Sequence, residues 1–533
     1  MAGPVVATRP AIGTPVTDPL HTGSSSLTRR LPQSGLSGPR TGARHRLPQV
    51  YGTADLVVLC LGVVIGAGIF TIAGRQAATS AGPGVVLSFM IAGIASLLAA
   101  MCWAELSSTM PSSGGAYTFA YTIFGEVWAW VIGWALLLEM QLAAAVVARV
   151  WSLHAAQTLA DLGINVPPPL AGMIGQPTGF DLFTLIILVL MVGVVAGGTR
   201  LGLRALWVMV MAKMLAIGTV IVVGAMNFEE SHLAAIPVDP LPVTTETGIA
   251  EKSLFALLIG DMHTFGWYGI AASAPAIAFA YMGFDIVTTA GEETADAPRT
   301  IPRGMIRGLA IATIVYIAVA VVMVGMARYD QIIPEAPLQS AFRAVGEDYM
   351  VLVVDVGAVL GLTTVILVVL VGQTRVLFAM ARDGLVPRRL ATLSRRRRSP
   401  ARLTWLIGVV TIVVSQVAPV LALEQLVVIG TLFAFVLVAV GVIVMRRSRP
   451  DLPRGFRVPM SPLTPLLSLA ASLWLLVNLQ LLTWIYFALW MGVGLVVYLL
   501  YGRSHSGLAP APSPRTSGRG RHRRHVGPVP YKD

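Results

Sequence analysis

AFAYMGFDIVTTAGEE, residues 278–293, begins as an apolar membrane-spanning helix begins and then carries Gly283 and Asp285 near its middle. Glycine weakens a helix because its backbone loses more conformational freedom on folding than that of other residues. A carboxylate is costly in lipid, so an acid within a membrane span is by default a candidate functional residue. This stretch therefore predicts a membrane helix that is interrupted for a functional reason.

The composition is that of a membrane protein. Hydrophobic residues make up 55% of the 533 positions and charged residues only 12%, whereas a soluble domain carries roughly a quarter charged residues. Apolar stretches of about 20 residues, each long enough to cross a ~30 Å hydrocarbon core, recur along nearly the whole chain. The sequence has no HExxH motif, no P-loop and no GxGxxG that enters a soluble βαβ unit. We therefore expect no enzyme, no catalytic residues, no cofactor and no metal site.

Twelve membrane spans are predicted between two polar tails. The tails, residues 1–50 and 505–533, are rich in Pro, Ser, Gly and Arg and are predicted to be disordered, which leaves residues 51–504 as the membrane domain. The third and eighth spans are longer than a bilayer and are expected to tilt or to project beyond it. The predicted spans are 54–78, 84–109, 117–157, 180–198, 203–226, 271–292, 304–327, 350–382, 403–419, 424–445, 463–482 and 484–502.

The basic residues indicate how the chain is oriented. Cytoplasmic loops of membrane proteins carry an excess of Lys and Arg, and an even number of spans places both tails on one side. Arginines are densest in residues 382–402 and 446–457, on the same side as the tails. We therefore expect a multi-pass plasma-membrane protein with both termini in the cytoplasm. The net charge of +12 then has a topological cause, which favours contact with anionic membrane lipid over binding of nucleic acid.

Charged residues remain inside the predicted spans, and each is a candidate functional residue because an intramembrane charge is expensive. Arg375 lies towards the cytoplasmic end of its span, where its side chain can reach the interface. For Arg149 the alternative is a structural ion pair between helices, with Glu139 as the partner. The full set is Glu139, Arg149, Lys213, Asp285 and Arg375.

The first predicted span has the same character as the sixth. Residues 61–74 read LGVVIGAGIFTIAG, with Gly66 and Gly68 at the centre, and the first and sixth spans each begin a block of five. Glycine-interrupted spans at matching positions of two halves are typical of inverted-repeat transporters, whose broken helices expose N–H and C=O groups at mid-membrane. Each glycine taken alone is better explained by close helix packing. The matched pair favours a binding site for a zwitterion.

Five stretches, in order, resemble the amino acid–polyamine–organocation permeases, and in particular the cationic amino acid transporter branch. GVVIGAGIF is similar to the first-helix motif of that family, and FAYMGFDIVTTAGEETADAPRTIPRG to its sixth-helix signature. The resemblance covers residues 51–504 and leaves out both tails. The other three stretches are AELSSTMPSSGGAYTFAYTIFGEVWAWVIGW, GAVLGLTTVILVVLVGQTRVLFAMARDGLVP and IGTLFAFVLVAVGVIVMRRSRPDLPRGFRVP.

The resemblance implies an all-α integral membrane protein of the LeuT/APC-like fold, with twelve transmembrane helices as two inverted five-helix repeats plus two trailing helices. It also implies secondary active import of L-amino acids. Backbone amides of the first motif would hold the substrate carboxylate, while carbonyls of the sixth-helix motif would hold the α-amino group and aromatic rings would close over the cargo. The first set is Ile65, Gly66, Ala67, Gly68 and Ile69, and the second is Phe279, Ala280, Tyr281 and Gly283.

Glu139 and Asp285 are the predicted charges at the pocket or gate. Asp285 is interpreted as a cap or gate residue, because a carboxylate is favourable at the N-terminus of the second half-helix. A cationic cargo needs a buried acid within reach, since an unpaired charge is expensive in this setting, and Glu139 is the candidate. Small neutral and cationic amino acids are therefore both candidate cargoes. The sequence predicts no oligomeric state.

Lys213 is predicted to couple transport to protons. It is the only lysine inside a span, and a buried lysine can exchange a proton whereas arginine stays charged. The resemblance places it on the fifth helix, near the first break and the eighth-helix hydroxyls of Thr363 and Thr364. A permanent ammonium that braces three helices is the alternative. For the whole chain, an amino acid sensor with a transporter fold and an amino acid/amine exchanger are the alternatives to an importer, and a channel is disfavoured because no repeated ring of ligands is visible.

Overall fold

The computed structural model describes residue 30 and residues 49–507, except 67, 165, 234–235, 243–251, 260–262, 335, 395–398 and 420–423. The two predicted tails, 1–50 and 505–533, therefore lie almost wholly outside the described residues. The described part of the chain is in essence the predicted membrane domain.

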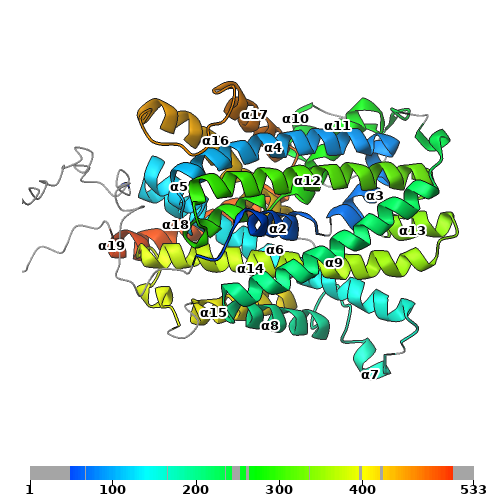
Figure 1. Cartoon of the computed structure of the whole chain (residues 1–533), viewed down its shortest axis with the longest axis horizontal. Helices are drawn as coiled ribbons and strands as arrows, with labels where there is room; N and C mark the ends of the chain where they lie inside the picture. Colours follow the sequence, from blue (N-terminus) through cyan, green and yellow to red (C-terminus); the bar gives the residue numbers. More distant parts are fainter. Residues whose placement is uncertain are drawn as a thin grey trace, which may run out of the picture.

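Long helices run side by side along the longest axis of the molecule (Figure 1). In chain order they are α2 (Thr53–Val64), α4 (Val85–Thr109), α6 (Glu126–Asp161), α8 (Leu182–Ala196), α9 (Thr199–Met226), α11 (Gly266–Ala278), α12 (Ala297–Met326), α14 (Tyr349–Arg382), α15 (Ala401–Val417), α16 (Glu424–Ser448), α17 (Leu463–Val477) and α18 (Leu481–Val497).

Short elements connect or extend these helices. They are η3 (Gly68–Ile72), α3 (Ala73–Gln76), η4 (Ala77–Ala81), η5 (Gly82–Gly84), α5 (Ala116–Ile123), α7 (Pro168–Ala171), η6 (Glu230–Leu233), α10 (Leu254–Ile259), η8 (Phe279–Tyr281), η9 (Phe284–Glu293), η10 (Tyr329–Gln331), α13 (Pro337–Ala344), η11 (Arg388–Ala391), η13 (Tyr498–Gly502) and α19 (Arg503–His505). Two strands of two residues each, β1 (Leu241–Pro242) and β2 (His263–Thr264), pair antiparallel.

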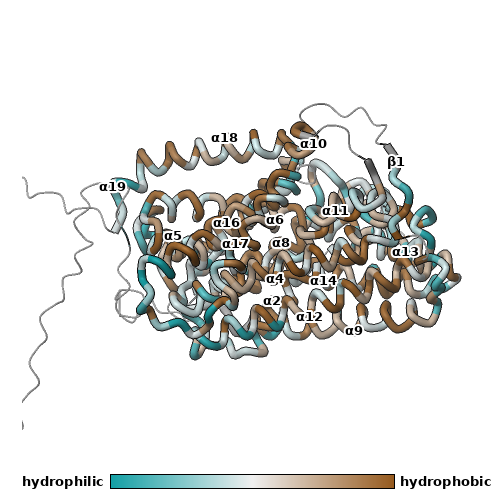
Figure 2. The backbone as a smooth tube through the Cα atoms, turned by 90° about the horizontal axis from the view of Figure 1, so that it is seen from above, coloured by the Kyte–Doolittle hydropathy of each residue, from teal (hydrophilic) through white to brown (hydrophobic). Residues whose placement is uncertain are grey.

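The outer surface of the bundle is apolar, which identifies an integral membrane protein. Large hydrophobic side chains point outward, among them Val208, Leu215 and Ile314 at 71%, 73% and 68% exposure. Within the described residues, 8 helices are long and apolar enough to cross a membrane, and shorter apolar helices accompany them. Figure 2 shows this hydrophobic character along the helices, with α18 on the outside of the bundle. Helices that are apolar all round are stable only when other helices or lipid cover them.

Several predicted spans have different boundaries in the structure, among them the third, the sixth and the seventh. The third, predicted as one helix over 117–157, is split into α5 and α6, because Gly125 adopts φ 111° and ends the first helical segment. The sixth begins at Gly266 rather than at residue 271. The seventh begins at Ala297 rather than at 304, with a proline in its first turn, where the missing N–H costs no helical hydrogen bond.

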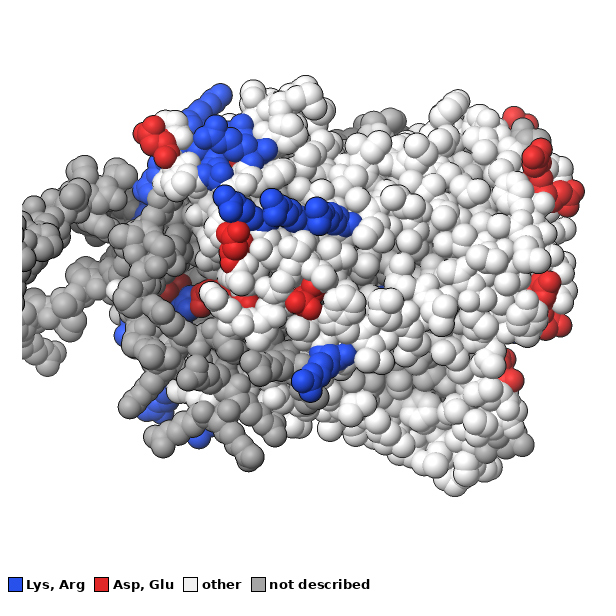
Figure 3. Space-filling view, in the orientation of Figure 1, with Lys and Arg blue, Asp and Glu red and all other residues white. Residues whose placement is uncertain are grey.

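The two ends of the bundle carry opposite charge (Figure 3). At one end, called the basic end here, exposed arginines lie in the first turn of α12, after α14 and in the last turn of α16, for example Arg299, Arg388 and Arg447. Exposed acids such as Glu229 and Asp330 lie in connections at the opposite, acidic end. This asymmetry follows from the same loop charges that predict the orientation of the chain.

Candidate functional site

The first break separates α2 from η3. Helix α2 ends at Val64, Ile65 leaves helical geometry with ψ 89°, and helical structure resumes at Gly68. A Cβ on Gly66 would lie 2.7 Å from Cγ2 of Val365, and one on Gly68 would lie 2.4 Å from Cβ of Ala280. These glycines therefore allow the first break to approach α14 and the second break closely. Ala67, the middle residue of the predicted motif, lies outside the described residues.

The second break lies within residues 278–293, where the sequence predicted an interruption. Helix α11 and η8 are followed by Met282 in extended conformation (φ −70°, ψ 158°) and by Gly283 in the left-handed region (φ 95°). A Cβ on Gly283 would also lie 2.5 Å from Cγ2 of Val63, on the last turn of α2. Glycine is thus required here both by its backbone conformation and by its neighbour.

One hydroxyl joins the two breaks. Oη of Tyr316, on α12, lies 2.5 Å from the carbonyl oxygen of Val64 and 2.9 Å from that of Ala280. A hydroxyl has a single proton, so it donates to one of these carbonyls at a time. Tyr316 is fully buried. The two breaks are therefore in direct contact through Gly68 and Ala280 and bridged through Tyr316.

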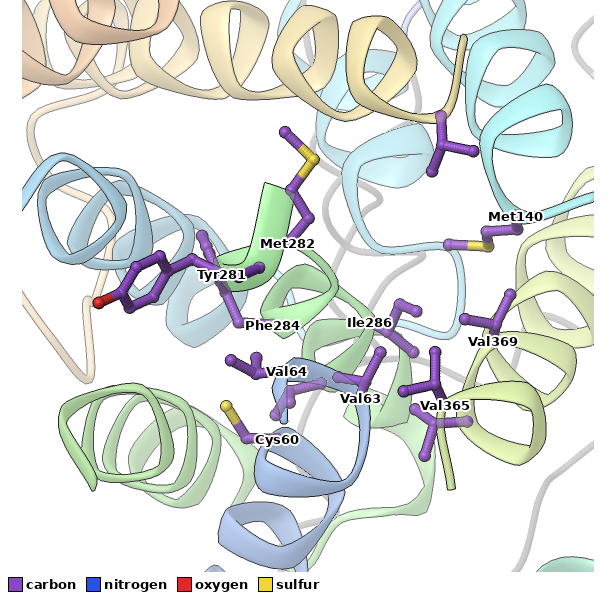
Figure 4. Packing of buried hydrophobic residues seen from close by; sticks show 14 of the residues in the cluster. Cys60, Val63, Val64, Met140, Tyr281, Met282, Phe284, Ile286, Val365 and Val369 are labelled. Carbon is purple, nitrogen blue, oxygen red and sulfur yellow. The ribbon is translucent and has the colours of Figure 1, made fainter. Parts of the chain in front are cut away.

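A cavity lies between the two breaks and helices α6, α14 and α16. Its empty space, including open solvent at its mouth, is about 600 Å³. The walls are mainly apolar, and Figure 4 shows Val63, Val64, Ile286, Val365 and Val369 among the packed side chains of this region. The lining residues are Val63, Val64, Gly66, Gly68, Glu139, Met140, Ala143, Val147, Phe279, Ala280, Met282, Gly283, Ile286, Val365, Val369, Val427 and Thr431.

The cavity contains many but not all of the predicted substrate-binding residues. Ile65 and Ile69 are buried without lining it. The Tyr281 ring also does not close over it, because its hydroxyl donates to the carbonyl of Phe89 on α4 at 3.1 Å. Asp285 is buried in the first turn of η9, and its Oδ1 has no hydrogen-bond partner among the described residues. The predicted residues that line the cavity are Gly66, Gly68, Glu139, Phe279, Ala280 and Gly283.

Lys213, which lies on α9, stabilises the first break through hydrogen bonds. Its Nζ lies within hydrogen-bond distance of four acceptors, the carbonyls of Leu61 (2.9 Å), Gly62 (3.2 Å) and Ile65 (2.6 Å) and Oγ1 of Thr364 (2.8 Å), and its three N–H groups donate to at most three of them at a time. These carbonyls belong to the last turn of α2 and the break, where helical partners run out: Leu61 still accepts from the N–H of Ile65, whereas the N–H of Gly66 donates to Val64 and not to Gly62. The ammonium therefore occupies the position of a C-terminal helix cap, where a cation is favourable.

Only one of the two predicted threonines contacts Lys213. Oγ1 of Thr364 accepts a hydrogen bond from Nζ of Lys213 at 2.8 Å and lies 2.7 Å from the carbonyl oxygen of Gly62, to which it can donate. Thr363 instead accepts a hydrogen bond from Nε1 of Trp151 at 2.8 Å. Adjacent residues on a helix point about 100° apart, so the two hydroxyls face different neighbours.

Arg149 and Glu139 do not form the ion pair that the sequence left open. Arg149 donates to the carbonyls of Gln176 (2.9 Å) and Gly179 (2.8 Å), and also to that of Ser415. Glu139 lies in the cavity, where its Oε2 has no hydrogen-bond partner among the described residues. Arg149 is thus a structural residue of the acidic end, and Glu139 is the acid that faces the cavity.

Arg375 does not extend to the interface as its position in the span suggested. It is buried and contacts Glu293 through Nε (2.6 Å) and Tyr51 Oη through Nη2 (3.0 Å). Burial raises the pKa of Tyr51 to about 12, although Arg375 acts in the opposite direction, so the phenol stays protonated. The N–H groups of Val50 and Tyr51 both donate to the carbonyl of Glu293. This strap, defined by Val50, Tyr51, Glu293 and Arg375, ties the start of α2 to the end of η9 at the basic end.

Sequence reasoning missed Tyr316, Met282 and the α14 and α16 side chains of the cavity. Tyr316 could have been noticed as a tyrosine in an otherwise apolar span. The valines of α14 that line the cavity cannot be distinguished in sequence from valines that face lipid. Within the described residues, no group of three or more His, Cys, Asp or Glu side chains is placed to hold a metal ion. The polar groups of the cavity are therefore backbone amides and carbonyls, Glu139 and Thr431.

Apolar helices that span a membrane and enclose a cavity between two broken helices define a permease, an integral membrane carrier of small molecules. Over residues 51–501 the chain matches the family model described as amino acid permease. The chain belongs to this family, and the resemblance seen in the sequence is confirmed.

Named relatives are similar along most of the chain. The methylthioribose transporter of Bacillus subtilis (strain 168) is 37% identical over 484 residues, which cover 90% of this chain and 99% of that protein. The branched-chain amino acid permease BcaP of the same organism is 37% identical over 473 residues, covering 88% and 96%. The vacuolar cationic amino acid transporter 4 of Arabidopsis thaliana is 33% identical over 435 residues, covering 80% and 68%. These relatives are transporters and permeases, not enzymes.

Proposed function

We propose that the chain is a secondary active transporter that imports L-amino acids with aliphatic side chains across the plasma membrane, driven by protons. Both termini lie in the cytoplasm, with the basic end facing inward. The twelve helices form two inverted five-helix repeats plus two trailing helices, and α2 and α11 begin the repeats. Membership of the amino acid permease family supports the transport of amino acids.

The observation that carries this proposal is the cavity between the two breaks. In this position the start of η3 offers backbone N–H groups to the substrate carboxylate, since a helix N-terminus favours an anion. Carbonyls of the second break, near Phe279 and Ala280, receive the α-amino group. Those of Leu61, Gly62 and Ile65 already accept from Lys213, which leaves the second break for the ammonium.

The lining supports an aliphatic side chain as the third element of the cargo. Valines from α2, α14 and α16, together with Met140 and Ile286, surround the space beside the breaks. An apolar wall gains free energy by burying a hydrocarbon side chain and leaves a charged one without partners. The named branched-chain amino acid permeases among the relatives agree with this choice.

Lys213 carries the proposed proton coupling. Its ammonium donates to carbonyl and hydroxyl oxygens and forms no ion pair with a carboxylate of the described residues, and its side chain is fully buried. A neutral amine at this position can no longer donate to all of these acceptors, so loss of the proton loosens the first break. Protonation from the outside and release to the inside would couple this change to the gradient.

Glu139 supports cationic amino acids as a second candidate cargo. Its carboxyl faces the cavity, and Oε2 is without a hydrogen-bond partner among the described residues. A cationic side chain could supply that partner. Glu139→Gln distinguishes the two cargoes: loss of arginine uptake with alanine and leucine uptake retained supports cationic recognition, whereas equal loss of all three makes Glu139 structural.

Uptake by purified protein in proteoliposomes tests the proposed function. Labelled leucine, alanine and arginine are offered with and without an inward proton gradient, and with and without sodium. We expect saturable, gradient-driven and sodium-independent accumulation of leucine. A sodium requirement contradicts proton coupling, exchange without net accumulation indicates an exchanger, and binding without uptake indicates a sensor. Competition by methylthioribose tests whether the substrate of the named relative shares the site.

A further inference from the structure

A second, smaller cavity lies directly behind the second break. Its lining comes from α4, the second break, α16 and α17, and its empty space, open solvent included, is about 280 Å³. Side chains with little bulk, such as Ala95, Ala278 and Ala471, leave this space unfilled. The residues that line it are Ala95, Ser96, Ala278, Tyr281, Met282, Leu432, Phe435, Ala471, Ser472 and Leu475.

Met282 separates the second cavity from the cavity between the breaks. Among the residues that line either space, Met282 is the one common to both. Its backbone is extended and is followed by the left-handed Gly283, which sets the direction in which the side chain leaves the chain. In Figure 4 the Met282 side chain points away from Val63 and Val365, on the opposite side of the break.

Methionine is suited to such a partition because it is unbranched, has three rotatable bonds and adapts to irregular spaces. Rotation of the Met282 thioether towards α17 would lengthen the cavity between the breaks. Rotation towards Ile286 would shorten that cavity.

We propose that Met282 sets the upper size limit of the cargo side chain, and that the second cavity receives the distal atoms of side chains beyond that limit. This inference rests on the proposed function, because it assumes that the cargo is an amino acid bound between the breaks. Through Ala471, which lines the second cavity, helix α17 would also contribute to cargo selection. This helix is one of the two trailing helices outside the proposed repeats.

The test measures the ratio of phenylalanine uptake to alanine uptake in proteoliposomes. Met282→Ala and Met282→Val join the two cavities, so we expect the ratio to rise about tenfold, the typical effect of a few methylene groups of extra space in an apolar pocket. Met282→Leu keeps the volume and is expected to leave the ratio within about twofold of the wild type.

Ala471→Leu provides the reverse change, because it fills the second cavity from α17. Combined with Met282→Ala, it is expected to return the ratio to the wild-type value. Ala470→Leu is the matched control, since residue 470 lies on the same helix but is exposed. Ala470→Leu combined with Met282→Ala should therefore keep the raised ratio.

The outcomes separate this inference from the proposed function. Alanine uptake by the wild type reports on the proposed function alone. If Met282→Ala and Met282→Val transport alanine but leave the ratio unchanged, Met282 does not set the size limit of the cargo, and the proposed transport of amino acids is unaffected. The same conclusion holds if Ala471→Leu and Ala470→Leu have equal effects in the Met282→Ala background.

Discussion

The two broken helices are held open by different means. At the first break, the ammonium of Lys213, on another helix, donates to the carbonyls of Leu61, Gly62 and Ile65. At the second break, the backbone turns through its own left-handed Gly283, and the hydroxyl of Tyr316 reaches the carbonyl of Ala280. The first break is therefore supported by a side chain whose charge is lost when it releases a proton, as the proposed coupling requires, whereas the second depends on backbone geometry that titration does not change.

This difference shows how one binding site can combine a rigid part, the second break, with a part whose support depends on protonation, the first break. A turn built from backbone conformation keeps its shape in every protonation state, so the backbone of the second break is a fixed support. In the proposed mechanism the first break responds to the protonation state of Lys213. Variants that remove one support at a time therefore test the comparison directly.

Removing the ammonium should have the largest effect. Lys213→Met removes the donor of the Ile65 carbonyl, and an unsatisfied buried group costs about 1–3 kcal/mol, whereas the Leu61 and Gly62 carbonyls keep the Ile65 N–H and the Thr364 hydroxyl. We expect a lower unfolding temperature and loss of concentrative uptake under an inward proton gradient. Lys252→Met, at an exposed position before α10, is the control. Concentrative uptake by Lys213→Met that still follows the gradient would refute the assignment of the proton site.

Adding one methyl group between the two breaks should have the next largest effect. The new Cβ of Gly68→Ala would lie 2.4 Å from Cβ and 2.8 Å from Cα of Ala280, and such overpacking costs about 1–3 kcal/mol. We expect the protein to insert and fold but to lose uptake, because the breaks are forced apart. Gly218→Ala on α9, where nothing lies within 4 Å, should leave uptake unchanged. Equal uptake by both variants would remove Gly68 from the site.

Deleting the bridging hydroxyl should have the smallest effect. Tyr316→Phe keeps the ring but removes the donor to the carbonyls of Val64 and Ala280, a change worth about 1 kcal/mol. We expect uptake to fall roughly fivefold, with the unfolding temperature lowered by less than in Lys213→Met. Tyr486→Phe, on the exposed side of α18, is the matched control. An unchanged uptake rate in Tyr316→Phe would mean that the breaks are aligned without the bridge.

Much of the site could be predicted from sequence because its backbone requirements leave a visible mark. Gly283 stands out in an apolar run, and the structure places it in the one backbone region that other residues avoid. Lys213 was equally visible as a lysine within a span, and its contact with Thr364 follows the predicted neighbourhood. Features that depend on a special residue type are therefore readable in advance.

The remainder depends on the rotation of each helix, which the sequence does not reveal in a chain that is apolar all round. Thr363 and Thr364 were predicted together, yet only Thr364 faces Lys213. Tyr281 was expected over the cargo and instead reaches α4. Met282 and Val365 carry no polar signal, because a cavity wall and a lipid-facing wall use the same residues.

The strap at the basic end has a mechanical consequence. The N–H groups of Val50 and Tyr51 are bonded to the carbonyl of Glu293, whose carboxylate is in turn bonded to Arg375. A pulling force applied to the chain ahead of Val50 is therefore shared between α2, through the continuous backbone, and the end of η9, through these hydrogen bonds. A force on the N-terminal segment would therefore act on both broken helices at once.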